Sequence, residues 1–145
     1  LTVLLVMDSY VELYKGGIVP LADFVNMPYD RDILVRVIVK KTAAHYSYKS
    51  VRISKTDFPV LTCAAALTQK GVQAAVGARP AKAALVKDAE QLATLPMTAE
   101  KAQAFAEYAA GLLPTETNPR GSAAYRTHLI KVLTARCLTE LGGKA

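Results

Sequence analysis

Two apolar runs on either side of Lys70-Gly71 constrain the fold of this chain more than any other feature. The first run, VLTCAAALTQ, ends at this pair, and the second run, VQAAVG, begins directly after it. Glycine between two such runs is typical of a tight turn, because glycine adopts the positive φ angles that many hairpin turns require. The sequence therefore predicts an antiparallel β-hairpin at Gly71.

The residues before this hairpin add extended segments. Residues 33–39, ILVRVIV, are apolar and β-branched, which favours a strand buried on at least one face. Residues 45–51, HYSYKSV, alternate in part along an extended chain. One side of that segment carries Tyr46 and Tyr48, and the other carries Ser47, Lys49 and Val51. We expect residues 33–77 to form an antiparallel sheet of about three strands.

Two more apolar stretches open the chain. LTVLLVM and YVELY flank Asp8-Ser9, and Gly16-Gly17 follows the second stretch, so we expect a β-hairpin around Asp8-Ser9. Residues 20–24, PLADF, predict one short helical turn, because proline is tolerated at the first helical position.

The rest of the chain has helical spacing. Residues 81–93 place Leu85, Ala89 and Leu92 at helical intervals, and Thr98 is a candidate N-cap for AEKAQAFAEYAAGLL. The next helix follows the loop TETNPRGS. The apolar face predicted for the first of these two long helices contains Ala102, Phe105, Ala106, Ala109 and Leu113, and that of the second contains Tyr125, Leu129, Val132, Leu133 and Cys137. Strands before helices predict an α+β fold, an antiparallel β-sheet with a C-terminal helical bundle packed on one face.

The net charge of +6 raises the question of a nucleic-acid partner. Such binding requires clustered cations, whereas Arg120, Arg126, Lys131 and Arg136 point in different directions at about 100° per residue. We therefore expect no nucleic-acid partner and interpret the basic residues as a solvated surface.

No apolar run approaches the about 18 residues that span a bilayer, and Asp8 interrupts the opening run. We therefore expect no membrane association and a cytoplasmic location. Because the chain of 145 residues begins at Leu1 inside an apolar run, we also expect that it is a fragment with further residues upstream.

Residues for catalysis or metal binding are sparse. The chain contains two histidines, His45 and His128, and neither lies near a G-x-S-x-G turn. Cys63 and Cys137 have no paired metal-ligand spacing with them, so we expect both cysteines to fill the core. No G-x-G-x-x-G or G-x-x-x-x-G-K-[ST] occurs, so any nucleotide phosphates would be held chiefly by another part of the protein.

The polar segment HYSYKSVRISKTDF directly precedes the most apolar strand, and two interpretations remain open. It is an edge strand with a solvated face, or it forms a wall for a flat amphipathic ligand such as a flavin ring. A flavin requires apolar and aromatic contacts on its faces and cations near its electron-accepting edge. Leu34, Tyr48, Lys49 and Asp57 would supply these groups.

Five motifs then occur in a recognisable order. They are PLADF, DRDILVRVIV, YSYKSVRISKTDFPVLTCAAAL, AVGARPAKA and NPRGSAAYRTHLIKVLTARCL. In this order, across nearly the whole chain, they resemble the carboxy-terminal part of the FAD-binding (medium) subunit of molybdenum hydroxylases, the xanthine dehydrogenase and carbon monoxide dehydrogenase flavoproteins. RGSAAYRTHL is the most distinctive of them.

The resemblance implies two parts. Residues 1–40 would end the FAD-binding domain with a β-hairpin remnant, and residues 41–145 would form the carbon monoxide dehydrogenase flavoprotein C-terminal-like domain. In the family FAD lies between these domains, and electrons reach it from a molybdopterin-binding subunit through an iron–sulfur subunit. The flavin then passes them to NAD or another acceptor. The resemblance thus implies one wall of a FAD site in an oxidoreductase complex, with the fragment alone inactive.

Three residues are carried over by position. Lys49 matches a lysine that reaches the flavin edge and favours its reduced, anionic form, Leu34 matches an apolar contact to the ring, and Asp57 falls in a loop near the isoalloxazine. Arg120 and Tyr125 instead look architectural, with Tyr125 on the inner face of its helix.

The sequence also departs from the family. Its glycine-rich pyrophosphate-binding segments are missing, so we expect FAD in the complete protein and not in this fragment. The segment ISKT at 53–56 lacks a second arginine that is common there. The alternative function is an interaction or assembly module that keeps the same scaffold and binds no flavin.

Overall fold

The structure, a computed structural model, describes residues 1–29 and 31–143. Asp30, which belongs to one of the motifs quoted above, and residues 144–145 lie outside this description. The described chain forms two antiparallel sheets, of three and four strands, and two long helices at the carboxyl end. The predicted α+β class is confirmed, although the main sheet has four strands rather than about three.

The larger sheet contains β4, β5, β6 and β7 in that spatial order, and each neighbouring pair is antiparallel. These strands span His45–Val51, Leu61–Thr68, Gly71–Gly77 and Ala84–Lys87. The hairpin predicted at Gly71 is confirmed as the turn between β5 and β6. Gly71 has a φ of +106°, a backbone conformation that residues other than glycine rarely adopt.

Strand β7 occurs where the sequence predicts a helix over residues 81–93, so that prediction was wrong. Ala84–Lys87 form backbone hydrogen bonds with β6 instead. Asp88 follows the strand, and its carboxylate accepts hydrogen bonds from the N–H groups of Leu92 and Ala93. A short apolar pattern fits a strand and a helix equally well, and pairing with β6 decides between them.

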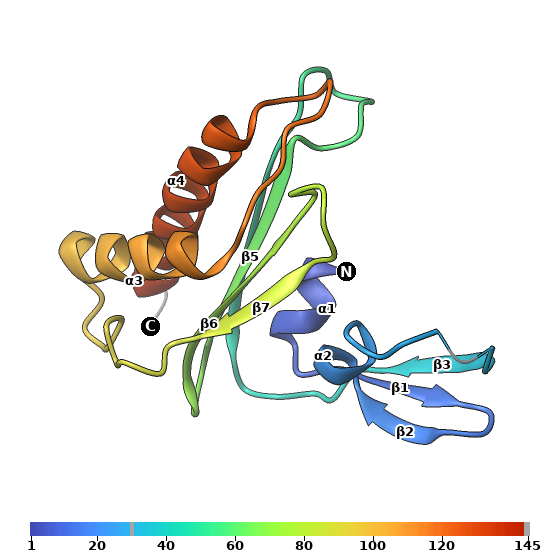
Figure 1. The fold of residues 1–145 in the computed structure, drawn as a ribbon. Coiled ribbons are helices and arrows are strands. Elements are labelled where there is room, and N and C mark those ends of the chain that lie inside the picture. The colour runs from blue at the N-terminus through green and yellow to red at the C-terminus, as the bar shows by residue number, and fades with distance from the viewer. Residues whose placement is uncertain (30, 144–145) are drawn as a thin grey trace.

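Helices α3, Ala99–Leu112, and α4, Ala123–Gly142, cover one face of the larger sheet (Figure 1). The side chain of Thr98 accepts a hydrogen bond from the N–H of Lys101, which confirms the predicted N-cap. The predicted apolar face of α3 is buried around Phe105. Together the two helices and the sheet enclose the main core.

The opposite face of this sheet is covered by α1, Thr2–Val6, where the sequence predicts a strand. Thr2, Leu5 and Val6 are buried, which is a helical spacing of three and four residues. The sheet surface below them is rich in alanine, and a Cβ at Gly77 would lie 2.9 Å from Thr2 Cγ2. These small residues allow α1 to approach closely, and its burial outweighs the local strand preference of its β-branched residues.

The smaller sheet has the order β2-β1-β3. Strand β1 spans Tyr10–Leu13, β2 spans Gly17–Pro20 and β3 spans Leu34–Ile38. The short helix α2 spans Leu21–Phe24. The amino-terminal hairpin therefore turns between Leu13 and Gly17 rather than at Asp8-Ser9. The predicted helical turn in PLADF is confirmed by α2.

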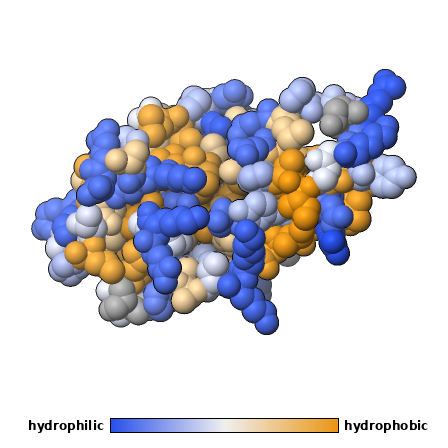
Figure 2. All heavy atoms as spheres, turned by 90° about the horizontal axis from the view of Figure 1, so that it is seen from below, coloured by the Kyte–Doolittle hydropathy of each residue, from blue (hydrophilic) through white to orange (hydrophobic). Residues whose placement is uncertain are grey.

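Strand β3 differs from its prediction in two respects. It pairs with β1 in the smaller sheet, so residues 33–77 do not form one sheet. It is also exposed rather than buried, and the exposed apolar residues include Ile33, Leu34, Val35 and Val37. Seen from below in Figure 2, apolar side chains reach the surface on the side of this smaller sheet. These side chains keep between 43% and 66% of their surface exposed.

Candidate functional site

Strand β4 is an edge of the larger sheet, and its two faces have different surroundings. Within the described chain β4 pairs with β5 along one side, and its other side is open. Ser47 and Lys49 face α4, whereas Tyr48 faces the side of the sheet that α1 covers. The alternation expected from the sequence is therefore present. It separates the candidate cation from the candidate aromatic residue.

Lys49 forms an ion pair with the last turns of α4. Its ammonium nitrogen lies 2.8 Å from Glu140 Oε2, and Ser47 Oγ donates to the same oxygen at 2.9 Å. The hydrogen bond to Glu140 raises the pKa of Lys49 above its ordinary value, and burial opposes that effect. The side chain of Lys49 remains 32% exposed. The sequence offered no signal for Glu140, which lies 91 residues away.

Two thiols lie beneath this ion pair. Cys63 of β5 and Cys137 of α4 are free and buried, as expected for core residues. Cys63 Sγ is 3.5 Å from Thr134 Oγ1, and its hydrogen bond with Cys137, together with burial, raises the pKa of the Cys63 thiol. The core side of Lys49, where these two thiols lie, is therefore closed to solvent.

Tyr48 borders a hollow of about 380 Å³ at the amino end of α1. The hollow lies between the first residues of α1 and the sheet, and its lining includes Leu1, Val3, Pro59 and Thr62. Tyr48 is 45% exposed, so part of its ring is free to contact a ligand. Sequence reasoning placed Tyr48 among the groups that suit a flavin, and the structure leaves it about as exposed as Leu34 and more exposed than Lys49.

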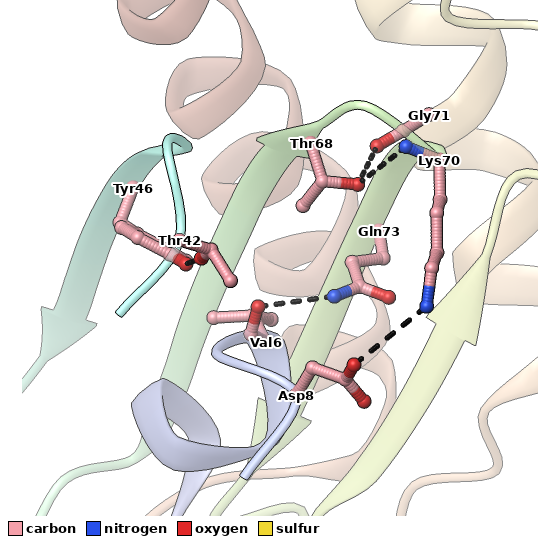
Figure 3. A network of polar contacts seen from close by, with 8 residues as sticks. All are labelled: Val6, Asp8, Thr42, Tyr46, Thr68, Lys70, Gly71 and Gln73. Carbon is pink, nitrogen blue, oxygen red and sulfur yellow. Dashed lines mark hydrogen bonds and ion pairs between the residues drawn. The ribbon is translucent and has the colours of Figure 1, made fainter. Parts of the chain in front are cut away.

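A larger hollow, of about 540 Å³, lies at the other end of α1. Figure 3 shows its polar groups: Gln73 donates to the carbonyl of Val6 at 3.0 Å, and Lys70 lies 3.8 Å from Asp8. The hydroxyl groups of Thr42 and Tyr46 are 2.9 Å apart. Apolar residues, among them Ala43, Ala44 and Val72, supply most of the remaining surface of this hollow.

Asp57 lies in the loop between β4 and β5. Its side chain accepts a hydrogen bond from the N–H of Phe58, and its carboxylate is 4.0 Å from Arg120. The Arg120 guanidinium lies 5.2 Å from the centre of the exposed Phe58 ring. Arg52 donates to the Asp57 carbonyl. The loop is thus tied to the segment that precedes α4.

Sequence reasoning placed Arg126 among the cations of a solvated surface, and for this residue that interpretation was wrong. Arg126 is fully buried, and it donates to the carbonyls of Val60, Glu116 and Gly121 and to the side chain of Asn118. Burial lowers its pKa. Tyr125, which was expected on the inner face of the helix, is instead 45% exposed. The inward position belongs to its neighbour Arg126, because a guanidinium can satisfy several loop carbonyls at once.

The sequence-predicted site residues are therefore distributed over the molecule. Lys49 and Asp57 belong to β4 and the loop that follows it, whereas Leu34 lies in the smaller sheet with its side chain exposed. The described residues contain no group of three or more His, Cys, Asp or Glu side chains able to hold a metal ion. They also include no helix with the length and apolar character needed to cross a membrane.

A sequence profile of the CO dehydrogenase flavoprotein C-terminal domain matches residues 46–141. The chain belongs to this family. The matched range begins in β4 and ends near the carboxyl end of α4, so it includes Lys49, Tyr48, Asp57 and Glu140. No curated protein sequence matches the chain significantly.

Solved structures with the same fold agree with this assignment. Quinoline 2-oxidoreductase from Pseudomonas putida 86 has a TM-score of 0.76 and 21% identity, covering 98% of this chain and 55% of that chain. Carbon monoxide dehydrogenase from Hydrogenophaga pseudoflava gives 0.80 and 17%, with 97% and 55% covered. A cyanide-inactivated Cu,Mo-CO dehydrogenase gives 0.81 and 17%, with 99% and 56% covered. The chain spans about half the length of these structures.

Proposed function

We propose that this chain forms one wall of the FAD site in the flavoprotein subunit of a molybdenum hydroxylase. The observation that carries the proposal is the position of β4. It is an open edge strand with an accessible aromatic ring on one face and a cation on the other, and it lies within the range matched by the family profile. In this proposal the ligand lies along this edge, where the two faces of the strand meet.

The residues present fit a flavin in their chemistry. Tyr48 offers an exposed ring for contact with the isoalloxazine, and Lys49 offers a positive charge for its pyrimidine edge. Leu34, in the smaller sheet, supplies an exposed apolar side chain. The chain has no glycine-rich phosphate-binding motif, so the upstream part of the subunit would hold the pyrophosphate.

Each residue has a separate role toward the bound cofactor. FAD would supply the two-electron chemistry, because a bound flavin accepts electrons from one partner and passes them to another. Lys49 stabilises negative charge on the reduced ring, and Tyr48 excludes water from one face. Asp57, fixed near Arg120, keeps the loop after β4 in place at the mouth of the site.

The whole protein would act in a complex in the cytoplasm. Its partners would be an iron–sulfur subunit that delivers electrons and a molybdopterin-binding subunit where substrate is oxidised, as in xanthine dehydrogenase or carbon monoxide dehydrogenase. NAD or another acceptor would then reoxidise the flavin. We also propose residues 1–40 as the end of the FAD-binding domain and residues 41–145 as the C-terminal domain. This boundary lies just before β4, where the ring would bind.

A test of FAD binding uses the full-length subunit that contains this chain. We expect a yellow protein with oxidised-flavin absorbance. Replacing Tyr48 with alanine should weaken FAD affinity about tenfold, because aromatic contacts contribute on the order of 1 kcal/mol. The affinity is measured by titrating the deflavinated protein with FAD and following flavin fluorescence.

Tyr125→Ala is the matched control, since Tyr125 has the same 45% exposure as Tyr48 and lies on α4. Its FAD affinity should equal that of the unmodified protein. A colourless full-length protein that does not take up FAD would contradict the proposal and favour the assembly-module alternative. Equal losses of affinity in the two tyrosine variants would remove Tyr48 from the site.

A further inference from the structure

Among the described residues, Glu140 is the acidic side chain that pairs with the Lys49 ammonium. A single carboxylate oxygen, Oε2, accepts hydrogen bonds from both Lys49 and Ser47. These two donors are separated by two positions and therefore lie on the same face of β4. The carboxylate thus joins the last turns of α4 to the strand at the position where the cation emerges.

We propose that Glu140 is a positioning residue for Lys49, holding the ammonium on the α4 side of β4 and thereby lowering the effect of its charge on the flavin. The inference rests on the proposed function, because it concerns the bound cofactor. It assigns to α4, through Glu140, control over how readily the ring is reduced.

The geometry indicates that Glu140 affects the position of the Lys49 ammonium as well as its net charge. A carboxylate 2.8 Å from an ammonium cancels part of the potential that the ammonium produces at a nearby ring. Ser47 is buried, and its hydroxyl donates to the same Glu140 oxygen that binds Lys49, which helps to hold that oxygen in place. The lysine stem is flexible, with several rotatable bonds, so its ammonium moves once the carboxylate is removed.

The first experiment measures the midpoint potential of the bound flavin in the full-length flavoprotein. Lys49→Met should lower the equilibrium constant for two-electron reduction about tenfold, because it removes a cation that favours the reduced, anionic ring. Glu140→Gln should raise that constant about tenfold, which corresponds to about 30 mV for a two-electron couple. The signs are opposite because Lys49→Met removes the positive charge, whereas Glu140→Gln releases that charge to act on the ring.

The double variant Lys49→Met with Glu140→Gln separates position from charge. If Glu140 acts by holding Lys49, the effect of Glu140→Gln should fall to less than about threefold when the lysine is absent. An equal effect with and without Lys49 would mean that the carboxylate acts only through its own charge, and the inference would be wrong. Glu140→Asp should shift the potential less than Glu140→Gln does, because its carboxylate can still bind the Lys49 ammonium.

The Glu107 and Lys131 pair provides matched controls. This glutamate–lysine ion pair joins α3 to α4, has an exposure similar to that of the Lys49–Glu140 pair, and lies outside the candidate site. Glu107→Gln and Lys131→Met should leave the midpoint potential unchanged. Shifts as large as those of the Glu140 and Lys49 variants would show a general charge effect and overturn the inference.

A second measurement needs no flavin. Amine-reactive esters modify the neutral form of lysine, and Glu140 stabilises the charged form by its hydrogen bond. In the deflavinated full-length protein, Glu140→Gln should speed acylation of Lys49 several-fold, as quantified by peptide mass spectrometry, and Glu107→Gln should not. An unchanged rate would show that Glu140 does not hold the ammonium.

The two proposals fail in different ways. If Lys49→Met leaves the midpoint potential unchanged while FAD binds, the role proposed for Lys49 fails, and with it the inference. If Lys49→Met shifts the potential and Glu140→Gln does not, the flavin site stands and the inference alone is wrong.

Discussion

Arg126 and Lys49 are two cations at the boundary between the larger sheet and α4, and their surroundings differ. Arg126 is fully enclosed and donates to oxygens of the loop before α4 and of Val60. Lys49 lies at the open edge, 32% exposed, with a carboxylate beside it. A buried cation that donates mainly to backbone oxygens maintains the fold, whereas a cation at an edge remains available to a ligand.

The largest expected effect comes from removing the enclosed cation. Arg126→Met should lower the free energy of unfolding by about 3–4 kcal/mol, because it leaves several buried carbonyls without donors. Urea denaturation of the full-length protein, followed by circular dichroism, measures this change. Arg136→Ala, at an exposed position of the same helix, should change the value by less than about 0.5 kcal/mol.

If Arg126→Met unfolds no more readily than Arg136→Ala, the distinction between the two cations would be lost. In that case the buried guanidinium would not be the group that holds the loop over residues 115–121 against Val60.

A smaller effect is expected at the edge, and it depends on pH. Lys49→Met should cost about 0.5 kcal/mol at neutral pH, since partly exposed ion pairs contribute little. The pKa of Lys49 is raised in the folded state, so the contribution of its charge is complete below the ordinary lysine pKa. It is lost as the pH rises through the raised value. The difference between the two proteins should therefore vanish in strongly alkaline buffer.

Urea titrations between about pH 8 and about pH 11 measure this dependence. A difference that grows with rising pH would have the wrong sign and would contradict the ion pair with Glu140.

Local signals in the sequence were sufficient for some elements. The turn at Gly71 was predicted because glycine itself permits the positive φ angle that the turn requires. The N-cap at Thr98 was predicted because a cap forms its hydrogen bond within one helical turn. Helix α1 and strand β7 were not predicted, because each depends on the sheet that it packs on or pairs with. Packing and pairing over long sequence distances override short local patterns.

The candidate site shows the same division. Alternation along β4 placed Lys49 and Tyr48 on opposite faces correctly, since that pattern is a property of any extended strand. The contacts that give these residues their character come from elsewhere. Glu140 approaches Lys49 from α4, and the first residues of α1 form the hollow beside Tyr48. No pattern in HYSYKSV indicates either partner.

The central claim is that the open edge of β4 contacts a flavin ring, and a crystal structure of the full-length subunit with FAD tests it most directly. We predict that the isoalloxazine lies along β4, with the Tyr48 ring within about 4 Å of it and the Lys49 side chain at its edge. A flavin that contacts neither side chain, with β4 facing bulk solvent, would contradict the account.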